Sequence, residues 1–195
     1  MGTRGIYGFR KNGIDKITYN HLDSYPKGLG EDIADFCRNN DIAKLNQLCD
    51  KIQMVNNRTQ PTEEQVEDCK QWTNLKVSEG RVEDWYCLLH KTQGDLTVYQ
   101  NGLNYMMDYS NFIKDSLFCE HGYIINLDTN ELEYWEGFQQ EADPTNRYGS
   151  EEDCGYFPCR LSMTFPIDRI PENAVELMEA ASAELETDDE MEALN

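Results

Sequence analysis

Basic residues, long apolar runs and histidines are all scarce in this chain. Its 195 residues include 17 Lys and Arg against 37 Asp and Glu, for a formal charge of −20, and only three His. A basic nucleic-acid-binding surface is therefore excluded, because phosphate contacts need Lys and Arg in excess. No apolar run approaches the roughly 18 residues of a membrane helix, and the mean hydropathy is −0.73. We expect no membrane span and no direct contact with nucleic acid.

Targeting signals and paired cysteines are also missing. The N-terminal segment has no apolar stretch of the kind that a secretory leader carries, and Ile6 stands where a myristoylation signal has Ser or Thr. The seven cysteines are odd in number and irregular in spacing, which is typical of reduced thiols. We expect a cytoplasmic protein, located in the host cytoplasm if a phage encodes it.

The chain does contain enough apolar and aromatic residues to build a hydrophobic core. Hydrophobic residues make up 39% of the chain and aromatic residues 11%, so wholesale disorder is excluded. The length fits one domain. We expect this domain over residues 1–185, with a helical insert at about 30–107, followed by an acidic tail at 186–195. Nine acidic residues and no basic one occur from Glu172 onward.

Two hairpins and one further strand are predicted from alternating residues and turn signals. Asn12-Gly13 joins strands predicted from residue 3 to 9 and from residue 16 on, and Thr129-Asn130 joins strands predicted at 122–128 and 131–137. A fifth strand is predicted at 160–165. Helical spacing predicts helices over about 30–38, 42–55, 62–72, 82–90, 95–107 and 171–185. This order predicts an α+β fold with a mainly antiparallel sheet of about five strands and several helices packed on it.

Two of these helices have clear start signals. Asp41 precedes a helix in which Ile42, Leu45, Leu48, Ile52 and Val55 share one stripe, and it is a good N-cap residue. Thr62 and Gln65 have the spacing of a capping box, in which each side chain bonds to the backbone of the other residue.

Four segments of the chain resemble an uncharacterised family of proteins found in phages, bacteria and some fungi. They are MGTRGIYGFRKNG, YNHLDSYPKGLG, DSLFCEHGYIINLDTNELEYWEGFQ and FPIDRIP. The resemblance runs through most of the chain but implies no established activity. The helical insert and the acidic tail look individual to this protein.

The favoured function is a non-catalytic acidic interaction protein of phage type. A strongly negative protein is attracted to a basic groove. The expected partner is therefore a host protein with such a groove, for example a defence protein. By occupying the groove as a nucleic-acid mimic, this protein would inhibit its partner. Aromatic and acidic side chains are the expected binding residues: Tyr134, Trp135, Tyr148, Glu151, Glu152 and Asp153. The alternative is that the charge only keeps the protein dissolved.

An enzyme is the second hypothesis. An N-terminal hairpin with polar residues on its second strand is remotely similar to N-terminal-nucleophile hydrolases, in which a freed N-terminal residue attacks and its own amine is the base. That similarity implies Thr3 as nucleophile after loss of Met-Gly, with Arg4, Asn20 and His21 as oxyanion or base partners. The simpler interpretation of Asp23 and Ser24 is that they bond to the turn backbone.

No cofactor is predicted, and a metal site is the weakest of the hypotheses. Cys119, His121, Cys154 and Cys159 are four conceivable zinc ligands. Their spacing is looser than that of the usual zinc half-sites, so buried free thiols are preferred. The glycines at 2, 5 and 8 form no phosphate-binding loop, because a strand follows them. Glu131, Glu133 and Glu136 are assigned to the solvated face of a strand.

Overall fold

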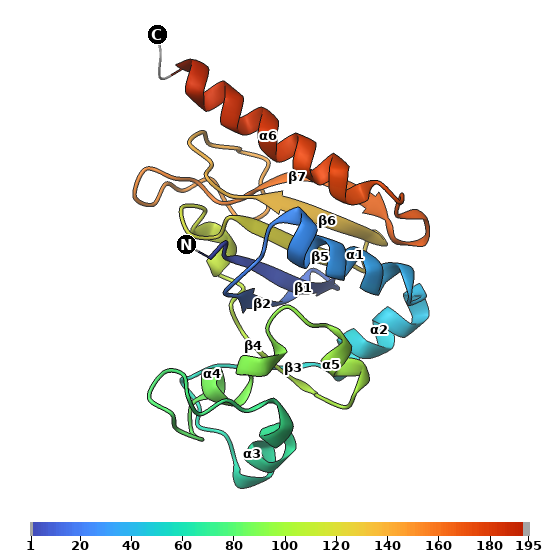
Figure 1. Cartoon of the computed structure of the whole chain (residues 1–195), viewed down its shortest axis with the longest axis vertical. Coiled ribbons are helices and arrows are strands. Elements are labelled where there is room, and N and C mark those ends of the chain that lie inside the picture. Colours follow the sequence, from blue (N-terminus) through green and yellow to red (C-terminus); the bar gives the residue numbers. More distant parts are fainter. Residues whose placement is uncertain (1, 193–195) are drawn as a thin grey trace.

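The protein is built around one five-stranded sheet, as a computed structural model of the chain shows (Figure 1). The structure describes residues 2–192, with side chains up to residue 183. The strand order is β2-β1-β5-β6-β7. The strands are β1 (Gly5–Lys11), β2 (Ile14–Asn20), β5 (His121–Asn126), β6 (Glu131–Glu136) and β7 (Arg160–Pro166).

The sheet is mixed, although most of its pairs are antiparallel as predicted. β1 and β5 run parallel, whereas β1–β2, β5–β6 and β6–β7 are antiparallel. The parallel pair arises because the chain leaves the sheet after β2 and returns for β5 at the other side of β1. The α+β class is confirmed, with the correction that the sheet is mixed.

Both predicted hairpins form, and their turn residues explain why. Asn12 and Gly13 have φ angles of 54° and 72°, the left-handed pair that a tight hairpin turn requires. Asp128 accepts hydrogen bonds from both backbone N–H groups, at 2.6 and 2.8 Å. The turn of one hairpin is thereby tied to the turn of the other.

Helices pack mainly on one face of the sheet. The structure contains α1 (Glu31–Arg38), α2 (Ile42–Lys51), α3 (Glu63–Cys69), α4 (Trp85–Leu88), α5 (Thr97–Gln100) and α6 (Ala174–Glu192). The side chain of Asp41 accepts from the N–H of Lys44, and the capping box of Thr62 and Gln65 is complete. Both start signals read from the sequence are therefore confirmed.

The insert is less helical than predicted. The helix expected to reach residue 55 ends at Lys51, and the one expected over 95–107 ends at Gln100. The residues beyond them form two short parallel strands, β3 (Gln53–Val55) and β4 (Tyr105–Met107). These strands, with α3, α4 and α5, form the lower part of the molecule in Figure 1. Pairing between distant segments overrode the helical spacing.

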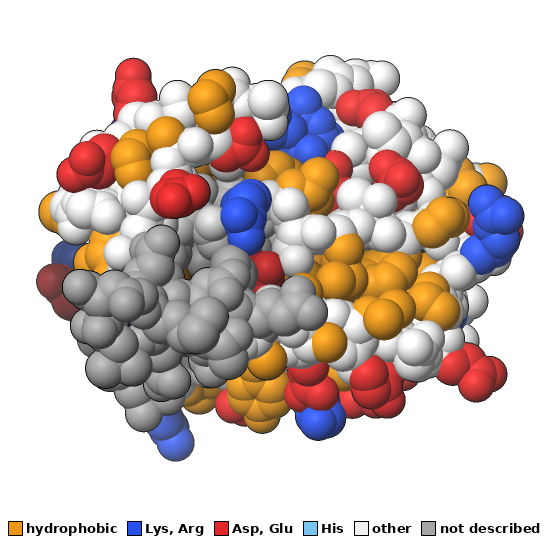
Figure 2. Space-filling model, turned by 90° about the horizontal axis from the view of Figure 1, so that it is seen from above, with side chains coloured by type: hydrophobic (Ala, Val, Ile, Leu, Met, Phe, Trp, Pro, Cys, Tyr) orange, Lys and Arg blue, Asp and Glu red, His pale blue; other side chains and the backbone are white. Residues whose placement is uncertain are grey.

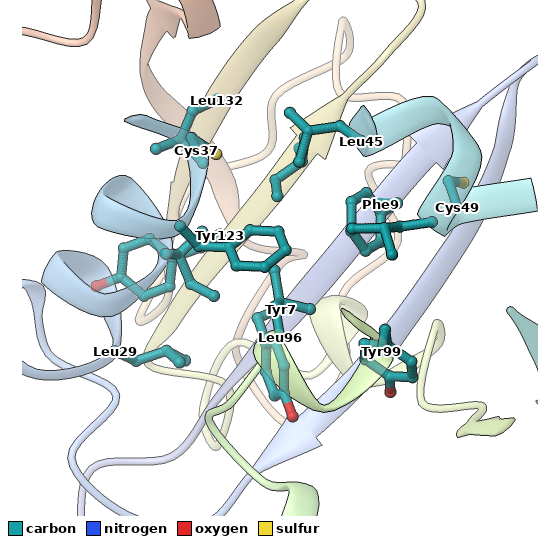
Figure 3. Close-up of a cluster of buried hydrophobic side chains, with 14 of the residues drawn as sticks. Tyr7, Phe9, Leu29, Cys37, Leu45, Cys49, Leu96, Tyr99, Tyr123 and Leu132 are labelled. Atoms are coloured by element: carbon teal, nitrogen blue, oxygen red, sulfur yellow. The ribbon is translucent and has the colours of Figure 1, made fainter. Parts of the chain in front are cut away.

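The main core lies between the sheet and the helices. Tyr7, Phe9 and Tyr123 are completely buried and stand on the same face of the sheet, where side chains from α1, α2 and the loop before α5 meet them (Figure 3). Cys37 and Cys49 belong to this layer, and burial raises the pKa of the Cys37 thiol to about 12. All seven cysteines are unpaired, and six are buried.

Charged side chains are intermixed on the face seen at the α6 end. Figure 2 shows acidic, basic and apolar side chains next to one another there. This face is not one uniform acidic field. A site for a charged partner therefore has to be a particular cluster of charged residues. The candidate lies in the loops that cover the face of the sheet opposite the main core.

Candidate functional site

A small second core covers the opposite face of the sheet and supports the candidate site. Ile6, Ile17, Ile124 and Trp135 point to this face, where they meet residues of two long loops, including Ile113. The loops comprise residues 108–120 and 137–159. Backbone hydrogen bonds join them, including one of 2.9 Å from the Cys159 N–H to the Ile113 carbonyl. The loops therefore form one connected layer.

A buried carboxylate lies at the centre of this layer. Glu133 on β6 is 3% exposed. It accepts from Asn126 Nδ2 at 2.7 Å and from Trp135 Nε1 at 2.9 Å, and Arg147 binds both of its oxygens. A buried charge needs this degree of pairing, because burying it alone is costly. The expectation that Glu133 lies on a solvated strand face is wrong, and the same holds for Glu136, which is 4% exposed.

The guanidinium of Arg147 also lies over two aromatic rings. Its central carbon lies 4.5 Å from the Trp135 ring centre and 4.9 Å from that of Tyr148. The two rings meet edge to face at 5.0 Å. Burial, followed by the nearby Asp15 carboxylate, raises the pKa of the Tyr148 phenol. The loop is thus held to the sheet at Arg147 and Tyr148 by contacts that leave these side chains little freedom.

Directly after this anchor the chain forms an exposed acidic loop, defined here as residues 149–155. Glu151, Glu152 and Asp153 are all exposed. The loop closes in a two-residue turn, where Asp153 and Tyr156 exchange backbone hydrogen bonds of 2.8 and 3.0 Å. The central residues Cys154 and Gly155 have φ angles of 52° and 86°, as in a tight hairpin turn. The turn therefore fixes the backbone at Asp153, directly after Glu151 and Glu152.

The acidic loop borders a cleft of about 750 Å³. Asp115 from the facing loop contributes a fourth carboxylate, and Lys114 and Arg147 also line the cleft. Arg147 is already paired with Glu133. Burial, and then the charge of Asp153, raises the pKa of Asp115. The carboxylates thus repel one another across the cleft, and a bound cationic group relieves that repulsion.

The expected binding residues divide into two groups. Tyr148, Glu151, Glu152 and Asp153 line the cleft. Tyr134 and Trp135 lie on adjacent positions of β6 and are 0% and 2% exposed, so burial removes both from the surface that a partner touches. The Trp135 ring instead packs edge to face against the ring of Tyr148.

The residues implied for a hydrolase lie at the end of the first hairpin but make separate contacts. The Arg4 guanidinium lies over the Phe118 ring at 4.7 Å, and His21 bonds to Tyr19 through its ring at 2.7 Å. Asn20 donates to Leu22 and Ser24. Among the described residues, no hydrogen bond joins any two of the side chains of Thr3, Arg4, Asn20 and His21.

The four conceivable zinc ligands are not assembled. Cys154 is exposed in the acidic loop, whereas Cys119 and Cys159 are buried in the second core. Cys159 Sγ donates to the carbonyl of Cys119 at 3.2 Å, and the His121 ring bonds to Tyr134 at 2.9 Å. Within residues 2–183, no three His, Cys, Asp or Glu side chains are arranged to hold a metal ion.

Glu133, Arg147 and Asn126, which support the site, are not among the residues predicted from the sequence. Glu133 and Trp135 are two residues apart on one strand, and this spacing places both on the same face. Nothing in the sequence indicated that Arg147 would be the partner of Glu133.

Comparison with known proteins assigns no family. Neither the protein-family models, the curated proteins nor the solved structures contain a match to this chain. None of the helices in the described part of the chain has the length and apolar character to cross a membrane.

Proposed function

We propose that this protein is a non-catalytic binding protein whose acidic loop and cleft engage a basic groove of a partner protein. The observation that carries the proposal is the cluster of exposed carboxylates at 151–153, held next to Asp115 on a loop anchored by Arg147 and Tyr148. Preorganised charges bind better than mobile ones, because less conformational freedom is lost on binding.

The charge of the whole chain and the resemblance of its segments favour a particular kind of partner. A formal charge of −20 accelerates encounter with a basic surface. The resemblance to a family that includes phage proteins favours a host protein, such as a defence protein that binds nucleic acid in the same groove. Occupation of that groove would inhibit it.

The test compares two variants with the same change in charge. The first carries Glu151→Gln, Glu152→Gln and Asp153→Asn. The control carries Glu63→Gln, Glu64→Gln and Glu67→Gln on α3, where all three residues are exposed. Binding of a fluorescently labelled oligo-arginine peptide is measured by anisotropy at low and high salt, and each variant is also used as bait in a nuclease-treated host lysate.

We expect the loop variant to weaken binding about tenfold, since each exposed ion pair contributes roughly 0.2–1 kcal/mol, and to flatten the salt dependence. The control should change binding much less. Equal losses in both variants would show that only net charge matters. Binding of the unaltered protein that does not respond to salt would overturn the proposal.

A further inference from the structure

A second cavity, distinct from the cleft beside the acidic loop, lies at the open end of the first hairpin. It has a volume of about 400 Å³ and shares no lining residue with that cleft. Segments from three parts of the chain form it: the end of β2 with the turn after it, the start of α1, and the loop at 93–95. The lining residues that the structure describes include the carboxylates of Asp23, Asp32 and Asp95 but no Lys or Arg.

The buried polar residue in this lining is Asn20, which is 5% exposed. Its Nδ2 group donates to the carbonyl of Leu22 at 2.5 Å and to Ser24 Oγ at 2.9 Å. A carbonyl oxygen only accepts, so the amide nitrogen must face Leu22 and the orientation of the carboxamide is determined. The Oδ1 atom of Asn20 therefore points away from both partners.

This oxygen is left without a hydrogen-bond donor among the described residues. Among the described residues, every side-chain nitrogen or oxygen that is fully enclosed has a hydrogen-bond partner. Because the Oδ1 atom of Asn20 has none, it is not fully enclosed, and Asn20 lines the cavity. Gly94, in the facing loop, has a φ angle of 80°, and a Cβ atom there would lie 3.3 Å from this oxygen. The absence of a side chain at Gly94 keeps the approach to Asn20 clear.

Among the described side chains, no Lys, Arg or His forms an ion pair with any of the three carboxylates. Burial, followed by the charges of Glu31 and Asp95, raises the pKa of Asp32. Asp95 accepts from the backbone and hydroxyl of Thr97 through Oδ1, which leaves its other oxygen available. The carboxylates are not arranged around a single metal ion, since no such group of three exists among the described residues. An extended organic cation fits the cavity better.

We propose that this cavity binds a primary ammonium group, which donates to Asn20 Oδ1 and is neutralised by Asp32 and Asp95. An ammonium has three donors and no acceptor, so it matches one amide oxygen and two carboxylates. The alkyl part of the ligand lies along Leu29 and Tyr25, which also line the cavity. The ligand class is a small aliphatic amine, or the same group on a lysine side chain.

Isothermal titration calorimetry with cadaverine tests this proposal. The Asp32→Asn variant should weaken binding about tenfold, which is the loss of roughly one charge-assisted hydrogen bond. Asp35→Asn is the matched control, because Asp35 lies on the same helix but pairs with Arg38 outside the cavity. It should leave the affinity unchanged. The neutral analogue 1,5-pentanediol should not bind.

Nuclear magnetic resonance locates the bound amine. Cadaverine should shift the side-chain amide signals of Asn20, because its oxygen gains a donor. Nα-acetyl-lysine methylamide then distinguishes the source of the ammonium: affinity equal to that of cadaverine assigns the cavity to a lysine side chain, and weaker affinity assigns it to a free amine. The proposal is overturned if cadaverine does not bind, if Asp32→Asn and Asp35→Asn behave alike, or if Asn20 does not respond.

Discussion

Replacement of Arg147 by Met tests the support of the acidic loop most directly. The side chain of Arg147 is 25% exposed, whereas that of Glu133 is 4% exposed. Removing one partner of a buried ion pair costs about 3–5 kcal/mol. Partial exposure of the guanidinium and the two remaining donors to Glu133, from Asn126 and Trp135, reduce this cost. We expect a loss of about 2–4 kcal/mol in the free energy of unfolding.

Urea unfolding followed by circular dichroism measures this loss. With a slope of roughly 2 kcal/mol per molar urea for a chain of this size, the midpoint should fall by about 1–2 M. Binding at the acidic loop should weaken in the same variant, since Arg147 no longer holds the loop to the sheet.

Two companion variants separate charge from geometry. Arg147→Lys keeps the positive charge but loses the bidentate hydrogen bonds to Glu133 and the stacking on Trp135 and Tyr148. It should therefore lower the free energy of unfolding by about 1–2 kcal/mol. Combining Arg147→Met with Glu133→Gln removes both charges and should recover much of the stability lost in the single variant. A loss below about 1 kcal/mol for Arg147→Met, or no recovery in the double variant, would refute the reasoning.

Two further predictions concern the sheet itself. Gly8 has a φ angle of 153°, and a Cβ atom there would overlap the carbonyl oxygen of Lys16. Gly8→Ala should therefore lower the free energy of unfolding by about 3 kcal/mol or more, measured by thermal or urea unfolding. Gly102→Ala is the control: Gly102 has a φ of 99° but open space around it, so the substitution should cost only about 1–2 kcal/mol of backbone strain. Burial lowers the pKa of His121 to about 4. In the unfolded chain this histidine takes up its proton at a higher pH, near 6.5, so acid favours the unfolded state. The free energy of unfolding should therefore fall by about 3 kcal/mol between roughly pH 6.5 and pH 4. Titration of His121 by NMR with a midpoint near 6.5 would contradict this, and His121→Gln should remove the corresponding pH dependence.

The hydrogen bonds around His121 show why its protonation disturbs the fold. Its ring bonds to Tyr134 at 2.9 Å, Tyr134 bonds to Ser182 of α6 at 2.7 Å, and Ser182 donates to Glu136 at 2.7 Å. These bonds connect β5, β6 and α6. A charge on the His121 ring would therefore be introduced where the last helix is attached to the sheet.

Local patterns in the sequence determined most of the elements. The Asn12-Gly13 turn, the N-cap at Asp41 and the capping box of Thr62 and Gln65 each depend on neighbouring residues, so they were predictable and are confirmed. The alternation of Tyr123, Ile124 and Ile125 likewise placed these side chains on opposite faces of one strand, as the two cores show.

Tertiary structure alone decided which polar residues become buried and which come together. Val55 continues a helical stripe in the sequence, yet it lies in β3 because β4 offers a parallel partner from residues 105–107. Glu133 has the sequence context of a surface residue, but Arg147 closes over it from a loop. Asn20 faces a cavity whose other walls come from α1 and from the loop at Gly94. Pairing, burial and cavities depend on contacts between distant segments, which only the folded chain brings together.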